Sequence, residues 1–173
     1  MEEALFILVI FILLMATVYV DWCDYNYALK QLEEKERGLV KIDGCPFCNI
    51  EKERIIYENR SFIAVYDEYP VSKGHVLIIS KDHKDRCFHD LYHTGLDDIE
   101  KSDLIEAIWH MQDYLSRTLG VMDFNVGWNN GKYAGQTVNH FHCHIIPRRL
   151  GDTDNPRGGI RGCIPEKMNY KAH

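Results

Sequence analysis

Three histidines occupy alternate positions in the segment His140-Phe141-His142-Cys143-His144. Successive side chains of a strand point to opposite faces, so the three imidazoles would share one face while Phe141 and Cys143 pack on the other. Three interpretations are open: a histidine-rich core strand, a zinc hydrolase with three imidazole ligands, and a histidine nucleophile supported by two others. The core strand is the least favoured, because every buried imidazole needs a hydrogen-bond partner.

Hydrogen-bond donors gather just ahead of these histidines. Gly135, Gln136 and Thr137 place a backbone amide, a side-chain amide and a hydroxyl before the strand, and residues 129–131 form an Asn-Asn-Gly turn. Groups of this kind surround anions in proteins. They favour the nucleophile, a neutral imidazole that attacks phosphorus and forms a covalent phosphoramidate-type intermediate.

Cys45 and Cys48 form a second constellation, with two residues between them. This spacing suits half of a zinc site, a redox pair, or thiols without a function. A redox pair would need a thioredoxin-like βαβ pattern, whereas residues 55–69 indicate two strands joined by a turn. A zinc site would need two more ligands.

Hydrophobic periodicity predicts the elements that position these groups. Strands are expected around residues 63–65 and at 76–79, 124–128 and 140–146. Apolar residues recur at helical spacing over 97–119, and Gly120 ends that run. Strands with one long amphipathic helix predict an α+β domain with a mainly antiparallel sheet.

The N-terminus carries an uncharged apolar run at residues 4–20. Seventeen helical residues would extend about 26 Å, near the lower limit for a hydrocarbon core of about 30 Å. We therefore expect a transmembrane anchor at 1–22 and a polar helical spacer at 23–43. Basic residues follow the run and none precedes it, which predicts a single-pass membrane protein with its catalytic domain in the cytoplasm. If translation began at Met15, the remaining apolar run would be too short to span a membrane.

Composition restricts the partners. The chain of 173 residues fits one globular domain, and 20 basic against 26 acidic residues argue against nucleic-acid binding. The extension at 151–173 is locally basic, which suits either a polyphosphate substrate or a solvated tail.

The segment 129–148 resembles the signature of the histidine-triad (HIT) superfamily of nucleotide hydrolases and transferases, in which three histidines alternate with apolar residues. Residues 62–67 and 73–83 resemble the two strands that precede the triad in that family. The resemblance covers about 44–149 and implies a HIT domain at 44–150.

The resemblance also implies catalytic roles. His142 matches the nucleophile that attacks the α-phosphorus of a nucleotide, and His144 matches the residue that hydrogen-bonds the phosphate and helps to protonate the leaving group. Gln136 and Thr137 match donors to phosphate and leaving-group oxygens.

Substrate binding is implied for Asp67, which would accept hydrogen bonds from the ribose hydroxyls, and for Asn129 on the phosphate side. Gln136, Thr137 and His144 would contact the substrate as well. The resemblance implies nucleotide ligands and a homodimer.

Family members with the cysteine pair complete a Cys₂His₂ site with two histidines, and the matching positions here are His83 and His140. The implied cofactor is a structural Zn²⁺ held by Cys45, Cys48, His83 and His140. The role of His75 stays open, with orientation of the triad as one option.

The resulting functional hypothesis is a hydrolase of dinucleoside polyphosphates or nucleoside phosphoramidates that forms a nucleotidyl-histidine intermediate. The alternatives are a nucleotidyltransferase or phosphorylase using the same intermediate, and a non-catalytic, zinc-stabilised nucleotide-binding module.

Overall fold

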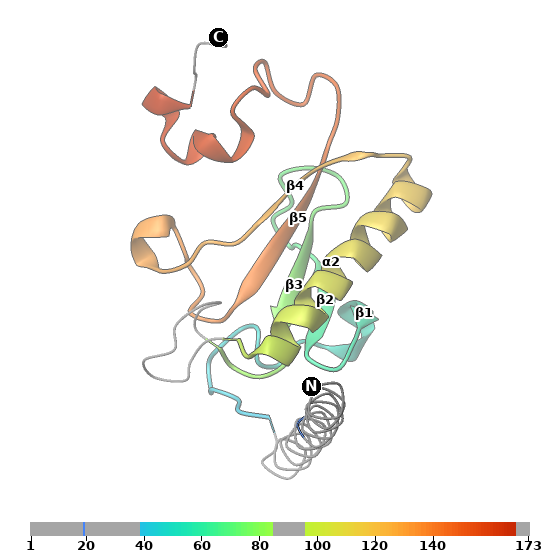
Figure 1. Cartoon of the computed structure of the whole chain (residues 1–173), viewed down its shortest axis with the longest axis vertical. Coiled ribbons are helices and arrows are strands. Elements are labelled where there is room, and N and C mark those ends of the chain that lie inside the picture. The colour runs from blue at the N-terminus through green and yellow to red at the C-terminus, as the bar shows by residue number, and fades with distance from the viewer. Residues whose placement is uncertain (1–18, 20–38, 85–95, 169–173) are drawn as a thin grey trace, which may run out of the picture. The chain divides into compact units, whose positions relative to one another are not determined.

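The computed structural model describes residues 19, 39–84 and 96–168. The chain divides into two compact units, Met1–Leu39 and Val40–His173, and the folded domain belongs to the second. Within the described residues five strands form an antiparallel sheet in the order β1-β2-β3-β5-β4, and α2 lies against one face of it (Figure 1). The elements are η1 (Lys52–Arg54), β1 (Ile55–Glu58), β2 (Phe62–Tyr66), β3 (Val76–Ser80), α2 (Asp98–Leu119), β4 (Asp123–Gly127), η3 (Lys132–Ala134), β5 (His142–Arg148), η4 (Gly159–Cys163) and η5 (Pro165–Lys167).

The helix α2 begins and ends where the sequence predicts. The Asp97 side chain accepts hydrogen bonds from the amides of Ile99 and Glu100, and the Glu100 side chain accepts one from the Asp97 amide. This capping box satisfies amides that the first turn leaves unpaired. Gly120 closes the helix in the left-handed conformation, with φ 66°.

The two faces of the sheet bury different sets of side chains. Ile78, Cys143 and Ile145 pack against α2, where they join a core that includes Leu104, Met111 and Leu115. On the opposite face, Ile63, Val65, Leu77 and Ile79 form a smaller cluster with Phe47, Ile50 and Ile55. The strand register pairs Leu77 with His144 and Ile79 with His142, so these two imidazoles lie on the face away from α2.

A buried carboxylate ties the β1–β2 turn to the helix. Arg60 donates two hydrogen bonds of 2.9 Å to Asp103 of α2, and the Ser61 hydroxyl donates another at 2.5 Å. The Asn59 side chain donates to the Asp103 carbonyl oxygen at 2.8 Å. Charge-assisted bonds to a carboxylate that is almost removed from solvent fix how the helix lies on β2.

The predicted sheet and covering helix are confirmed, but the predicted transmembrane helix is corrected. Across residues 19, 39–84 and 96–168, no helix is both long and apolar enough to cross a membrane. The expected anchor at 1–22 lies outside these residues except for Tyr19, and the described end of the expected spacer, 39–43, is not helical. The uncharged run was also short, at about 26 Å against about 30 Å. The single-pass membrane localisation with a cytoplasmic catalytic domain, which depended on the anchor, is withdrawn.

Candidate active site and metal site

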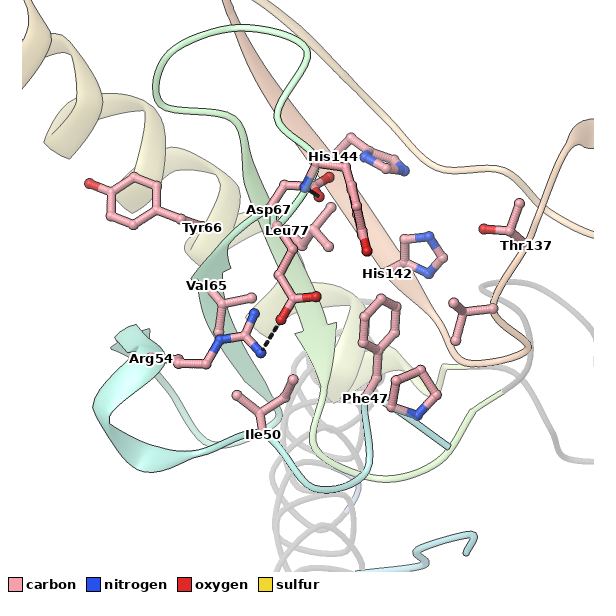
Figure 2. Close-up of a pocket in the computed structure, with 14 residues that line it drawn as sticks. Phe47, Ile50, Arg54, Val65, Tyr66, Asp67, Leu77, Thr137, His142 and His144 are labelled. Carbon is pink, nitrogen blue, oxygen red and sulfur yellow. Dashed lines mark hydrogen bonds and ion pairs between the residues drawn. The ribbon is translucent and has the colours of Figure 1, made fainter. Parts of the chain in front are cut away.

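A pocket of about 410 Å³ opens on the sheet face away from α2 (Figure 2). Its apolar wall contains Phe47, Ile50, Val65 and Leu77. Its polar side chains include Asp67, Thr137, His142 and His144, with Arg54 and Glu68 at another part of the wall. The pocket therefore combines an apolar slot with polar groups, the composition expected of a small-molecule site.

The ring of His142 is held in one orientation. Its Nδ1 lies 2.8 Å from the backbone carbonyl oxygen of His140. A carbonyl oxygen can only accept, so Nδ1 carries the proton and Nε2 keeps its lone pair. The ring of Phe47 packs edge-on against the imidazole, with centroids 5.0 Å apart. An imidazole with a fixed tautomer and a free lone pair beside a pocket is equipped to act as a nucleophile.

His144 belongs to a chain of hydrogen bonds that leads through His75 to Asp67, which also lines the pocket. Its Nδ1 lies 3.0 Å from Nε2 of His75, and Nδ1 of His75 lies 3.3 Å from Oδ2 of Asp67. The Val71 amide also approaches Nδ1 of His75, at 3.4 Å, but the charged carboxylate is the stronger partner. Asp67 thus favours a proton on His75 Nδ1, which makes His75 Nε2 the acceptor for His144 Nδ1–H. The lone pair of His144 is then on Nε2.

Burial keeps this chain of imidazoles neutral. Burial, with smaller contributions from the neighbouring His142 and His75 and against the opposing effect of Asp67, lowers the pKa of His144 to about 4. The pKa of His75 is also lowered by burial, although Asp67 opposes that shift. At neutral pH both side chains are uncharged in the protein without ligand.

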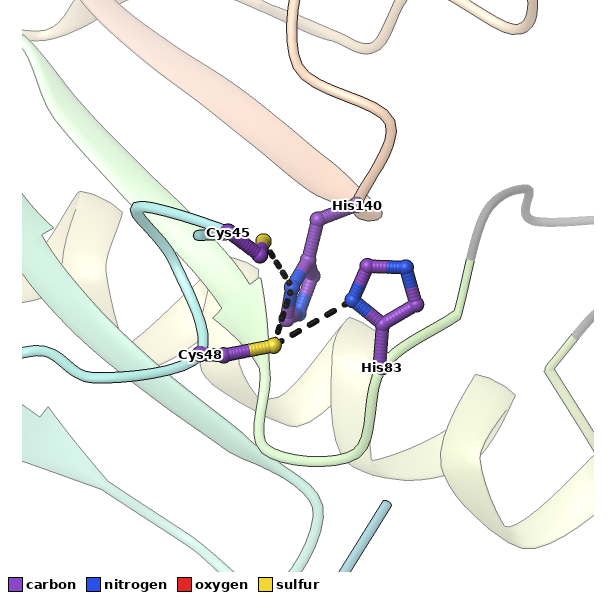
Figure 3. A group of neighbouring side chains, drawn as sticks. All are labelled: Cys45, Cys48, His83 and His140. Atoms are coloured by element: carbon purple, nitrogen blue, oxygen red, sulfur yellow. Dashed lines mark hydrogen bonds between the residues drawn. The ribbon is translucent and has the colours of Figure 1, made fainter. Parts of the chain in front are cut away.

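Four side chains predicted to bind metal lie together at one end of β3 and β5 (Figure 3). The sulfur and imidazole nitrogen atoms of Cys45, Cys48, His83 and His140 are all within 4.8 Å of one another. Cys45 Sγ and Cys48 Sγ lie 3.4 and 3.6 Å from His140 Nδ1, and Cys48 Sγ lies 3.2 Å from His83 Nδ1. In a tetrahedral zinc site, with Zn–S bonds of about 2.3 Å and Zn–N bonds of about 2.0 Å, a sulfur and a nitrogen ligand lie about 3.6 Å apart. The donor set therefore fits Zn²⁺.

The surroundings of the cluster support this fit. His140 Nε2 lies 2.8 Å from the Ser80 carbonyl oxygen, to which its N–H can donate. Nδ1, which faces the cysteine sulfurs, is then left to bind a metal, as is usual for a ligating imidazole. Burial lowers the pKa of His140 to about 4, so the ring is neutral, as a ligand must be. Burial raises the pKa of the Cys48 thiol. A bound cation would compensate for the buried thiolates.

Two predicted substrate contacts do not line the pocket. Gln136 accepts a hydrogen bond from the Gly131 amide at 2.8 Å and donates one to the Val138 carbonyl at 3.0 Å, and Asn129 donates to the Gly135 carbonyl at 3.4 Å. In this structure both amide side chains shape the loop that carries Thr137 into the pocket wall. Their assignment as substrate contacts remains a prediction.

The basic C-terminal segment also stays away from the pocket lining. Arg148 binds Asp152, and Arg149 donates to Ser72 and to the Lys73 carbonyl. Residues 151–168 contribute no side chain to the wall. This placement favours the solvated tail over a polyphosphate contact.

Sequence reasoning missed several pocket residues. Phe47 was detectable in principle, because the two residues between a pair of metal ligands must lie beside the cluster. Arg54 and Glu68 carry no sequence signal, since the antiparallel pairing of β1 and β2 brings them together. The Asp67–His75 contact likewise depends on the loop between β2 and β3.

Comparison with known proteins identifies the family. A family model described as the HIT domain matches residues 49–151, more than half of the chain. This chain therefore belongs to the HIT domain family, and the family predicted from the alternating histidines is confirmed.

Curated relatives agree with this assignment. An uncharacterized HIT-like protein of Methanocaldococcus jannaschii is 37% identical over 112 residues, 62% of this chain and 81% of the relative. The adenosine 5'-monophosphoramidase of Schizosaccharomyces pombe is 35% identical over 109 residues, 61% of this chain and 74% of the relative.

Solved structures share the fold. A HIT family protein from Bacillus anthracis matches with a TM-score of 0.55 and 32% identity, over 64% of this chain and 77% of that one. A zinc-bound histidine triad family protein from Mycobacterium smegmatis matches with a TM-score of 0.50 and 30% identity, over 57% of this chain and 68% of that one.

Substitution of a cluster cysteine should remove the metal. We expect purified wild-type protein to contain about one zinc per chain and Cys48→Ser to contain little, with a melting temperature lower by about 10 °C or more, because structural zinc contributes several kcal/mol. Elemental analysis and thermal unfolding measure both effects. Cys163→Ser, at an exposed free cysteine, is the matched control. Loss of zinc from His142→Ala and His144→Ala would instead indicate that the three alternating histidines bind the metal.

Removal of His75 should release the tautomer of His144. In ¹⁵N spectra near neutral pH we expect the Nδ1–H tautomer at His144 in wild type and a mixture in His75→Phe, which lacks the acceptor nitrogen. His110→Phe is the control, because His110 stacks on Tyr57 and does not line the pocket. An unchanged His144 spectrum in His75→Phe would contradict the proposed direction of the hydrogen bonds.

Proposed function

We propose that this protein is a nucleotide hydrolase that cleaves nucleoside phosphoramidates or dinucleoside polyphosphates through a nucleotidyl-His142 intermediate. The observation that carries the proposal is the fixed ring of His142, whose Nδ1 donates to the His140 carbonyl and whose Nε2 has no hydrogen-bond partner among the described residues beside the pocket. The phosphoramidase named among its relatives supports the same substrate class.

The pocket can accommodate each part of a nucleotide. A base would lie along Phe47, Ile50, Val65 and Leu77, which removes apolar surface of its ring from water. Asp67 would accept from the ribose hydroxyls. Its oxygens already accept from the Tyr69 amide and face His75, but a carboxylate has about four acceptor positions and keeps capacity for a sugar.

The reaction would proceed in two displacements. The Nε2 lone pair of His142 forms a bond to the α-phosphorus, and the bond from phosphorus to the leaving nitrogen or oxygen breaks. Thr137 and the amides of its loop would hydrogen-bond the charge that develops on the phosphate oxygens. Water then attacks the same phosphorus and displaces His142.

His144 would carry the proton in both displacements. Its pKa of about 4 in the free protein leaves it neutral, but an anionic phosphate bound beside it favours the protonated ring. The protonated ring gives its proton to the leaving group in the first step. In the second step the ring, now neutral, takes a proton from the attacking water. His75 and Asp67 hold the His144 ring in place throughout.

The covalent step is tested with the full-length, zinc-loaded protein. After brief incubation with adenosine phosphoramidate or diadenosine tetraphosphate, mass spectrometry should detect one added AMP on wild type and free AMP in solution. The adduct should be absent from His142→Ala, with turnover reduced at least a thousandfold, because the nucleophile is missing. His110→Ala, at an exposed position on α2, should behave as wild type.

Three other outcomes would contradict the proposed hydrolase. Turnover that persists in His142→Ala would exclude the covalent intermediate. An adduct that passes to phosphate or a sugar phosphate faster than to water would identify a transferase or phosphorylase. Nucleotide binding without adduct or product, in folded zinc-loaded protein, would identify the non-catalytic binding module.

We also propose that two copies of the chain pair through α2 and the edge strand β4. Ile105 and Trp109, which lie on the same side of α2, are 54% and 73% exposed, and β4 has a neighbour on one side only among the described strands. Light scattering should give about twice the chain mass of 20.2 kDa, and Trp109→Glu should shift it toward one chain. A wild-type mass of one chain would contradict this proposal.

A further inference from the structure

One ion pair in the pocket wall has no part in the proposed chemistry. Nη1 of Arg54 lies 2.7 Å from Oε1 of Glu68, and both residues line the pocket. Arg54 ends η1, immediately before β1, and Glu68 follows β2. Figure 2 shows Arg54 on the side of the pocket opposite Thr137 and His142, with Phe47 between them.

The position of the pair determines which part of a ligand it would meet. If the α-phosphorus lies at His142, as the proposed function requires, the base extends along the apolar wall and its polar edge points toward Arg54 and Glu68. The catalytic groups act at the phosphate end, so they leave the identity of the base undetermined. Arg54 and Glu68 are placed to determine it.

The charge of the pair favours a base over a phosphate group. Arg54 and Glu68 are together neutral, and the carboxylate would repel an anionic phosphate that approached the guanidinium. A neutral base edge that carries both donors and acceptors suits such a pair better. The guanidinium has five N–H donors and the carboxylate about four acceptor positions, so each keeps capacity after one contact.

We propose that Arg54 and Glu68 form a base-reading site that selects guanine nucleotides. Arg54 would donate to O6 of guanine, while N1–H and N2–H would both donate to the carboxylate of Glu68. In the same position adenine turns its N6 amino group, a donor, toward Arg54 and its N1 lone pair, an acceptor, toward Glu68, so neither contact forms. Hypoxanthine keeps O6 and N1–H but lacks the N2 amino group. A comparison of guanine with hypoxanthine therefore measures the contact of N2–H with Glu68 separately from that of N1–H.

The expected selectivity is modest because both side chains are partly in water. The Arg54 side chain is 35% exposed and that of Glu68 is 61% exposed. Hydrogen bonds to partly exposed charges are weakened by solvent, so we expect GMP to bind about tenfold more tightly than AMP, with IMP between them.

Calorimetric titration of the full-length protein with GMP, IMP and AMP tests the inference. Glu68→Gln should reduce the affinity for GMP to about that for IMP, since one amide oxygen cannot replace a bidentate carboxylate. Arg54→Met should lower the affinities for GMP and IMP by similar factors of about five and leave the affinity for AMP within twofold of the wild-type value. Glu51→Gln and Lys52→Met, exposed neighbours outside the pocket lining, are the matched controls, and melting temperatures verify that every variant is folded.

The failures of the two proposals are distinguishable. Equal affinities of wild type for GMP and AMP, or a preference for GMP over IMP that survives in Glu68→Gln, would overturn the base-reading site while the adduct on His142 still formed. Tighter binding of inorganic tripolyphosphate to Glu68→Gln, with no change in base preference, would show that Glu68 shields a phosphate contact and would also overturn it. Absence of all nucleotide binding would overturn the proposed function together with the inference.

Discussion

His140 is the residue on which the site depends most, because three different contacts converge on it. Its Nε2 is hydrogen-bonded to the Ser80 carbonyl of β3, its Nδ1 faces the sulfurs of Cys45 and Cys48, and its own carbonyl accepts from His142. The side chain therefore joins the cysteine loop to the sheet, and the backbone fixes the ring of the proposed nucleophile. A movement of His140 would disturb both the cluster and the tautomer of His142.

The alternation of side chains along β3 and β5 separates structural from chemical roles. Residues such as Ile78 and Cys143 face α2 and build the larger core, while the intervening His142 and His144 face the pocket. A one-residue slip in the β3–β5 register would place the imidazoles in the core and the aliphatic side chains in the pocket. Packing on the helix side thus enforces the geometry on the other side.

The sequence predicted those features that follow from local periodicity or from ligand chemistry. The shared face of the alternating histidines and the bounds of the long helix fall in this class, because periodicity and the closing glycine place them. Spacing indicated only the cysteine pair of the Cys₂His₂ cluster, whereas His83 and His140 were assigned through the family resemblance, and the structure brings the four together. The contacts of His75 with His144 and of Arg54 with Glu68 could not be predicted in the same way, since they depend on how the β2–β3 loop and the start of β1 lie in space. In this structure Gln136 hydrogen-bonds two backbone groups of its own loop, an arrangement that spacing does not reveal, and its predicted contact with a substrate stays a prediction. The expected anchor shows the limit of a hydropathy argument that rests on a run barely long enough.

The Cys45-Pro46-Phe47-Cys48 loop gives the pocket and the metal cluster a shared boundary. Pro46 and Phe47 line the pocket, and the cysteines on either side of them belong to the cluster. A change at either cysteine is therefore expected to alter one wall of the pocket as well as the metal cluster. For the same reason, a protein engineer who wished to reshape the slot for a larger base would find Phe47 constrained from both ends, and would have more freedom at Ile50.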